Sequence, residues 1–179
     1  MRGRFPPPAR FTMLALFAAV ALEGTASATD PPACPAGGTD RAAVVCEINA
    51  ARAAVGRAPL RSRSSLTEAA RAHSADMVAR RYFAHDSPEG EGPADRAWNA
   101  GYMRHAESWR VGEILLWSRG APLTAAGAIG MWLESPSHRR ILLSPRYRDV
   151  GAGPVPGAPL GDDGAASATT ITVDFGRRR

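Results

Sequence analysis

The chain has 179 residues, and its formal net charge of +5 gives a pI of about 10.2. This length indicates one domain, and four tryptophans are too many for a disordered chain. No apolar run reaches the roughly 18 residues of an ordinary membrane span. All basic side chains are arginine, which the codon usage of a GC-rich genome would explain, although a high pI is also typical of nucleic-acid or anionic-membrane binding.

The N-terminal residues 1–28 have the pattern of a secretory signal peptide. Three arginines lie within residues 1–10, an apolar stretch covers residues 11–22, and residues 26–28 (Ala-Ser-Ala) form a small-x-small cleavage pattern. We expect a secreted mature chain, extracellular or periplasmic, with no stable membrane span after processing. An uncleaved anchor and a misassigned start codon are the alternatives.

Export determines how the two cysteines are interpreted. Cys34 and Cys46 both lie in the mature chain, and an isolated pair in an oxidising compartment usually forms a disulfide. This bond would attach a Pro/Gly-rich leader, residues 29–41, to the first helix and contribute about 3 kcal/mol. Two buried free thiols are the alternative.

The mature chain contains several helical patterns, followed by strands near its C-terminus. Helices are expected at residues 40–55, 65–81, 93–100 and 124–134, with a further helical turn at 137–143. Strands are expected at residues 108–118, 149–155 and 169–175, with a flexible hairpin loop over 156–167. Asp40 should cap the first helix, and a capping box of Ser65 and Glu68 should open the second. This order predicts an α+β or three-layer arrangement.

The histidines and one acid are the candidate functional residues. His73 lies in an amphipathic helix and His105 in a polar stretch without a motif, so both are expected to be structural. His85 and His138 lie in loops or at helix ends, where functional side chains are often displayed. Glu113 interrupts an apolar run, and a buried carboxylate requires a histidine or arginine partner.

Spacing alone does not group these residues into a known site. The HExxH, GxSxG, P-loop and CxxC motifs are absent from the sequence. Ser87 and Ser137 lie close to the two loop histidines, but residues so near in sequence seldom form a catalytic hydrogen bond. A serine nucleophile is therefore disfavoured.

Eight segments in chain order resemble one known family. They are Ile48-Asn49-Ala50-Ala51-Arg52, Ala69 to Met77, Tyr82 to Pro88, Pro93 to Arg96, Gly112-Glu113-Ile114, Trp132 to Arg139, Asp149 to Gly153 and Asp174-Phe175-Gly176. Together they resemble the CAP superfamily of cysteine-rich secretory proteins, antigen 5 allergens and pathogenesis-related proteins, in its bacterial SCP-like branch. The resemblance implies an α+β fold: a three-layer α-β-α sandwich with a central, mostly antiparallel sheet. We expect this CAP domain over residues 42–176 and a basic tail over 177–179.

The resemblance also implies a cleft that contains two histidines and two acids. By position, His85 and His138 match the histidines. Glu113 matches the glutamate of the family's Gly-Glu-Asn motif, with Ile114 in place of the asparagine that would help to orient the loop.

The fourth member of the cleft is open. Animal members of the family place a glutamate where this chain has Ser135. Glu134 is one residue earlier and would point about 100° away on a helix. Asp149 is preferred, since bacterial members often carry an acid at this position.

Three function classes follow from the resemblance. The first is a secreted, non-catalytic module that binds a lipid, sterol, other small hydrophobic ligand or peptide. The second is a protease-like hydrolase in which His85, Glu113 and His138 act with or without a metal. The third is a structural or interaction domain of the cell envelope. Some family members bind zinc, so His85 and His138 are candidate ligands of a weakly held Zn²⁺.

The net charge divides unevenly along the chain. Residues 1–28 contain three arginines and one glutamate, and residues 177–179 are all arginine, which leaves residues 29–176 formally neutral. Nucleic acid is therefore not an expected partner. The tail is expected to fray and to contact anionic cell-envelope polymers only weakly.

Overall fold

The computed structural model describes residues 33–118, 123–161 and 168–179, so the predicted signal peptide lies outside the described residues. The elements are α1 (Arg41–Ala53), β1 (Arg61–Ser62), α2 (Ser64–Arg80), α3 (Pro93–Asn99), β2 (Trp109–Ser118), α4 (Ala125–Glu134), α5 (Pro136–Leu142), β3 (Asp149–Pro156) and β4 (Thr169–Arg178). No helix in these described ranges is long and apolar enough to cross a membrane.

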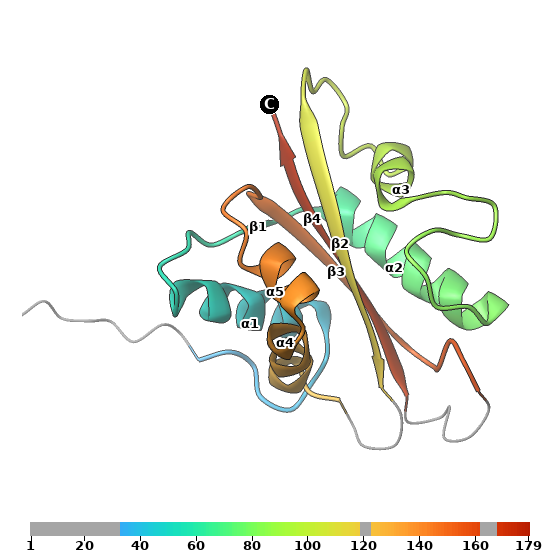
Figure 1. Ribbon diagram of the computed structural model, residues 1–179, viewed down its shortest axis with the longest axis horizontal. Helices are drawn as coiled ribbons and strands as arrows, with labels where there is room; N and C mark the ends of the chain where they lie inside the picture. Colours follow the sequence, from blue (N-terminus) through green and yellow to red (C-terminus); the bar gives the residue numbers. More distant parts are fainter. Residues whose placement is uncertain (1–32, 119–122, 162–167) are drawn as a thin grey trace, which may run out of the picture. The chain divides into compact units, whose positions relative to one another are not determined.

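The strands form one sheet in the order β1-β3-β4-β2. Strand β4 is antiparallel to both β2 and β3, and the short β1 is parallel to β3. Helices α2 and α3 lie on one side of the sheet, and α1, α4 and α5 lie on the other (Figure 1). The predicted α+β fold, a three-layer sandwich with a mostly antiparallel sheet, is confirmed. The two-residue strand β1 was not among the strands expected from the sequence.

Strand alternation gives the two faces of the sheet different chemistry. Successive side chains of a strand point to opposite faces. In β4, Ile171, Val173 and Phe175 belong to the main apolar core with Trp132 of α4. The alternate residues of β4 are polar, and Asp174 among them faces α2. The polar groups of the central sheet therefore lie between the sheet and α2.

Two glycines allow α2 to lie directly on the sheet. A Cβ atom at Gly151 would collide with the backbone of α2 at Leu66 and Thr67. A Cβ atom at Gly153 would collide with the backbone of Ala70 one turn later. Side chains at these positions of β3 would displace the helix that covers the polar face.

The first two helices begin in different ways. Asp40 caps α1 as predicted, because its Oδ1 accepts a hydrogen bond from the amide of Ala43 at 3.0 Å. The predicted capping box of Ser65 and Glu68 is wrong. Helix α2 starts at Ser64, after an N-cap residue, Arg63, that makes no side-chain capping bond, so Ser65 already lies inside the helix.

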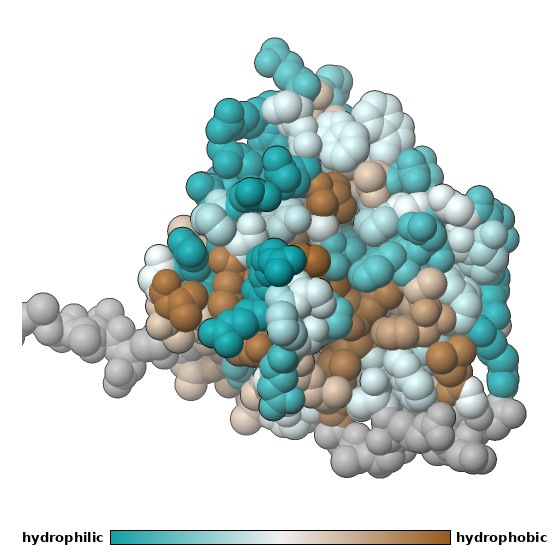
Figure 2. All heavy atoms as spheres, in the orientation of Figure 1, coloured by the Kyte–Doolittle hydropathy of each residue, from teal (hydrophilic) through white to brown (hydrophobic). Residues whose placement is uncertain are grey.

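The C-terminal arginines extend the last strand. Arg177 and Arg178 belong to β4 and pair with Arg110 and Trp109 of β2. The amide of Arg179 donates to the carbonyl of Ser108 at 3.0 Å. The expected fraying tail over residues 177–179 is therefore wrong, because β2 begins early enough to provide backbone partners. Hydrophilic side chains gather over this end of the sheet (Figure 2).

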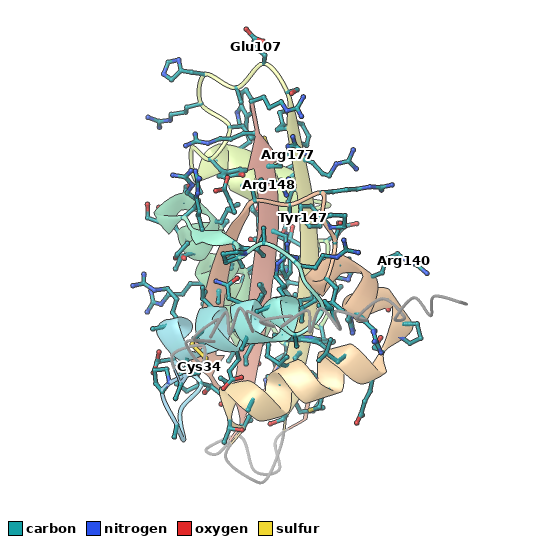
Figure 3. The ribbon with its side chains drawn as sticks, turned by 90° about the vertical axis from the view of Figure 1, so that its left-hand side faces the viewer. Cys34, Glu107, Arg140, Tyr147, Arg148 and Arg177 are labelled. Carbon is teal, nitrogen blue, oxygen red and sulfur yellow. A yellow bond between two sulfur atoms is a disulfide. The ribbon has the colours of Figure 1, made fainter. Side chains whose placement is uncertain are left out.

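The disulfide is confirmed. Cys34 and Cys46 are bonded with their Cα atoms 5.6 Å apart, within the range that a disulfide requires (Figure 3). The bond attaches the segment before α1 to that helix. The same segment is also held by α4, whose first amide, at Ala125, donates to the carbonyl of Gly38 at 2.9 Å.

Candidate functional site

Glu113 is the centre of a buried polar network on the α2 side of the sheet. The residue is 4% exposed in the middle of β2. Its Oε1 lies 2.7 Å from Nδ1 of His85, and its Oε2 accepts a hydrogen bond from Nη2 of Arg96 at 2.7 Å. The carboxylate therefore has both kinds of partner that its burial requires, a histidine and an arginine.

His85 lies on the loop between α2 and α3, and its side chain is 55% exposed. The hydrogen bond to Glu113 raises the pKa of His85, and partial burial opposes that effect. Because Glu113 occupies Nδ1, the ring nitrogen left without a partner among the described residues is Nε2. A carboxylate that holds one nitrogen of an imidazole in this way fixes the ring orientation and makes the other nitrogen a better ligand.

Arg96 of α3 holds this loop in place, a role that the sequence did not reveal. Its Nη2 donates to the carbonyl of His85 at 2.9 Å, and its Nη1 donates to the carbonyl of Glu91 at 2.7 Å. Arg96 is 7% exposed, so these bonds and the ion pair with Glu113 compensate a buried charge. The only signal in the sequence was an arginine in the first turns of a short helix.

Asp174 is a second buried acid, directly opposite Glu113 in the pairing of β2 and β4. It is fully buried, and neither of its carboxylate oxygens has a hydrogen-bond donor among the described residues. Burial, and next the negative charge of Glu113, raise the pKa of Asp174 well above its ordinary value. The neutral form is thereby favoured, and its hydroxyl can donate to Glu113.

His138 lies in the first turn of α5, which packs against β2, the strand that carries Glu113. Burial lowers the pKa of His138, and the nearby His85 lowers it further. Both effects favour a neutral imidazole in the neighbourhood of His85.

The two candidates for a fourth cleft acid lie elsewhere. Asp149 accepts a hydrogen bond from Nε of Arg63 at 2.8 Å and another from the hydroxyl of Tyr102 at 2.7 Å. It lies on β3, which β4 separates from β2 and Glu113. Glu134 is exposed at the last residue of α4. The acid that the fold brings to Glu113 is Asp174 instead.

His73 supports the loop from the side of α2. It is 1% exposed, and its Nε2 lies 2.9 Å from the carbonyl oxygen of Ala84, the residue before His85. Burial is the main cause that lowers the pKa of His73. This contact matches the structural role expected from the sequence.

A cavity of about 420 Å³ lies between α2, α3 and the loop that joins them. Its lining residues are Glu68, Ala69, Ala72, His73, Asp76, Ser87, Glu91, Arg96, Asn99 and Ala100. His73 and Arg96 connect the cavity wall to the network around Glu113. Neither His85 nor His138 lines it.

The donor set fits a metal ion only in part. Neutral imidazoles are suitable ligands, and Nε2 of His85 has no partner in the part of the chain that the structure describes. Protein zinc sites normally supply at least three ligands, whereas no group of three or more His, Cys, Asp or Glu side chains in the described ranges is arranged to hold a metal ion. A site made of His85 and His138 would therefore depend on water for its remaining ligands.

The fold, together with the site segments in their order along the chain, defines a CAP-domain protein. The sequence profile of the cysteine-rich secretory protein family (CAP) matches residues 45–174, and the chain belongs to this family. One relative, "Uncharacterized protein YkwD" of Bacillus subtilis (strain 168), is 30% identical over 112 residues, which cover 62% of this chain and 40% of the relative. The match thus spans well under half of that relative's length.

Two solved structures share the fold. An outer surface protein from Borrelia burgdorferi is 20% identical with a TM-score of 0.61, and the alignment covers 76% of this chain and 90% of that one. An extracellular protein containing a SCP domain from Bacillus anthracis str. Ames is 24% identical with a TM-score of 0.57, and the alignment covers 75% of this chain and 39% of that one. At these identities the comparisons establish the fold alone.

Proposed function

We propose that this protein is a secreted, non-catalytic binding module that holds a ligand in the cavity between α2 and α3. The cavity is the observation that carries the proposal. Its volume of about 420 Å³ falls within the range of small-ligand pockets. The alanines of the two helices supply an apolar wall, and the polar side chains around them would fix the orientation of a ligand.

The lining favours a peptide over a lipid or sterol. The carboxylates of Glu68, Asp76 and Glu91 all border the cavity. Glu68 has no side-chain hydrogen bond among the described residues, so it would be available to a cationic group. A peptide with a lysine or arginine side chain would pair with Glu68, whereas a sterol would bury the three carboxylates against hydrocarbon at a cost.

The hydrogen bonds of Glu113 disfavour a hydrolase in which Glu113 itself is the general base. A general base must offer a free oxygen to the proton that it removes. In this chain, His85 occupies one oxygen of Glu113 and Arg96 the other. A hydrolase in which Glu113 is itself the base requires one of these bonds to open when substrate binds, whereas a hydrolase in which His85 is the base does not.

Secretion is supported by the N-terminal sequence pattern and by the disulfide, since such bonds persist mainly in oxidising compartments. It is also consistent with the two structural relatives, which are described as an outer surface protein and an extracellular protein.

A cavity-filling variant tests the peptide proposal. Ala72 is exposed and lines the cavity, so Ala72→Trp should fill the space without disturbing the core. Ala53→Trp on α1 is the matched control, because Ala53 is also exposed and does not line the cavity. A random peptide library is selected against the wild-type protein, and the enriched peptides are measured by calorimetry with all three proteins.

We expect enriched peptides to carry lysine or arginine, to bind wild type and Ala53→Trp equally, and to lose binding to Ala72→Trp. Failure to enrich any peptide, or equal binding by Ala72→Trp, would overturn the proposal. Casein cleavage that disappears in Glu113→Ala would favour the hydrolase instead.

We also propose that His85 and His138 hold a divalent ion such as Zn²⁺ weakly, as a property separate from peptide binding. The free Nε2 of His85 and the neutral imidazole of His138 support this assignment. Calorimetric titration with Zn²⁺ should show weak binding to wild type that is reduced in His85→Ala and in His138→Ala. Equal binding by all three proteins would contradict it.

A further inference from the structure

Away from this cavity, the molecule concentrates arginines around two adjoining hollows. The first, of about 330 Å³, is lined by Ser108, Trp109, Arg110, Arg146, Arg177 and Arg179. The second, of about 610 Å³, is lined in part by Arg57, Arg139, Arg140 and Arg146. The two hollows share Arg146, and no acidic residue lines either of them. We call these seven arginines the arginine face; Figure 3 shows Arg140 and Arg177 on it.

The side chains of the arginine face are unpaired within the described part of the chain. Salt bridges with carboxylates are formed by Arg63, Arg80 and Arg96, all of which lie elsewhere. The side chains of the arginine face also make no hydrogen bond to the described residues. Their guanidinium groups are therefore available to an external anion.

The strand register places two of these arginines directly opposite each other. Arg110 of β2 pairs with Arg177 of β4, and like charges at opposed positions destabilise a sheet. The charge of Arg179 is the first cause that lowers the pKa of Arg177, and Arg148 and Arg110 add to it. Neither Arg110 nor Arg177 forms a salt bridge with a carboxylate among the described residues, whereas a bound anion would relieve the repulsion.

We propose that the arginine face binds a polyanion whose charge is carried by phosphate groups along a polyol or sugar backbone. A guanidinium group offers paired donors that match the oxygens of a phosphate. Two hollows joined by Arg146 form a track with room for successive phosphates, which a single small anion would not fill. This binding site is distinct from the cavity between α2 and α3, and the proposal does not depend on what that cavity holds.

The lining disfavours nucleic acid as the polyanion. Proteins that bind single strands without sequence preference stack successive bases on several aromatic side chains. Trp109, which is 49% exposed, is the one aromatic residue that lines either hollow in the described structure. One indole ring suits contact with a sugar ring or a polyol chain, and gives no platform for a series of bases.

Direct binding to labelled poly(glycerol phosphate), measured by fluorescence anisotropy with the full chain, tests this proposal. Arg110→Ser/Arg177→Ser should weaken binding at least about tenfold and make the dependence of log affinity on log salt shallower by about 1 to 2. Arg146→Ser, which affects both hollows, should weaken binding more than any other single substitution. These side chains are solvent-facing and repel one another, so the variants should fold, which circular dichroism checks.

Arg41→Ser/Arg71→Ser is the matched control. It removes the same charge from exposed helix positions outside both hollows and should change the affinity by less than about twofold. Equal weakening in the two double variants would show attraction to net charge alone and overturn the proposal. Absence of wild-type binding at low salt would also overturn it. Stronger displacement of the probe by poly-dT, at equal phosphate concentration, would identify nucleic acid as the partner and overturn the assignment of the polyanion.

Discussion

Strand β2 carries two kinds of charged site on its opposite faces. On the α2 side, Glu113 is buried, and both of its carboxylate oxygens have a partner. On the other side, Arg110 is exposed and faces a second arginine, Arg177, with no carboxylate partner in the described structure. Because these two positions of β2 are an odd number of residues apart, strand alternation directs their side chains to opposite faces.

The difference shows where this fold tolerates uncompensated charge. Burying a charge is costly, so the buried charges of Glu113 and Arg96 have to be paired with each other for the chain to fold. Exposed repulsion between arginines is weaker and screened by salt, so it persists without an internal partner. The buried charges of Glu113 and Arg96 are therefore held by each other, whereas charges on the exposed side remain free for binding.

Removal of Arg96 should have the largest effect. Arg96→Ala leaves Glu113 buried without its ion-pair partner and detaches the loop that Arg96 binds at two carbonyls. Breaking a buried ion pair on one side costs about 3–5 kcal/mol. Urea unfolding should show this loss, while Arg104→Ala, at an exposed position after α3, should unfold like wild type. Wild-type stability in Arg96→Ala would show that the buried network does not hold the fold together.

Neutralisation of Asp174 should have the opposite effect on stability: the variant should be more stable than wild type. Its pKa is raised in the folded state, so its favourable contribution exists below the unfolded pKa of about 3.9 and is lost as pH rises through the folded pKa. Asp174→Asn removes that loss and offers an amide donor to Glu113. We expect the variant to be more stable than wild type by about 1–3 kcal/mol at pH 8 and to lose this advantage near pH 4.

Urea unfolding at both pH values measures this gain. Asp76→Asn is the control, since Asp76 is a partly exposed acid on α2 that already accepts a hydrogen bond from Tyr82. An Asp174→Asn protein that is less stable than wild type at pH 8 would indicate that the buried carboxylate is ionised and that its oxygens accept hydrogen bonds.

Titration of His73 should also make the stability of the protein depend on pH, but by less than titration of Asp174. Its pKa is lowered on folding, mainly by burial, so its contribution is present above the unfolded value of about 6.5 and is lost as pH falls below it. His73→Gln retains a donor for the carbonyl of Ala84 but does not titrate. The difference in stability between wild type and His73→Gln should therefore change as pH falls from 7 to 5. Parallel profiles would show that His73 does not titrate differently on folding.

The sequence predicted most helices and strands because their signals are local. Asp40 is a cap beside an apolar helical pattern, and Glu113 is an acid in an apolar run. Asp174 was not predicted as a site residue because its role depends on the β2–β4 register, which pairs it with Glu113 across a long stretch of chain. Arg96 was missed for a similar reason, since its carbonyl partners lie in a loop without a pattern of its own.

The distribution of charge shows the same limit of prediction from the sequence: contacts between distant segments are not visible in it. Counting along the chain made residues 29–176 formally neutral, and the excess positive charge was assigned to the ends. Folding instead places Arg177 and Arg179 beside Arg110 and Arg146, which come from distant segments. A formally neutral domain can thus present a basic face, because charge density depends on which segments the sheet brings together.

The smallest predicted effect concerns the repulsion across the sheet. Arg110→Ser removes one of the two arginines that oppose each other in β2 and β4, so the Tm at low ionic strength should rise by no more than a few degrees. The gain should disappear at high salt, where exposed charges are screened. Arg71→Ser, an exposed change on α2, should leave the Tm unchanged. A fall in the Tm of Arg110→Ser at low salt would mean that Arg110 has a stabilising partner, and that the exposed side of β2 is as fully compensated as the buried side.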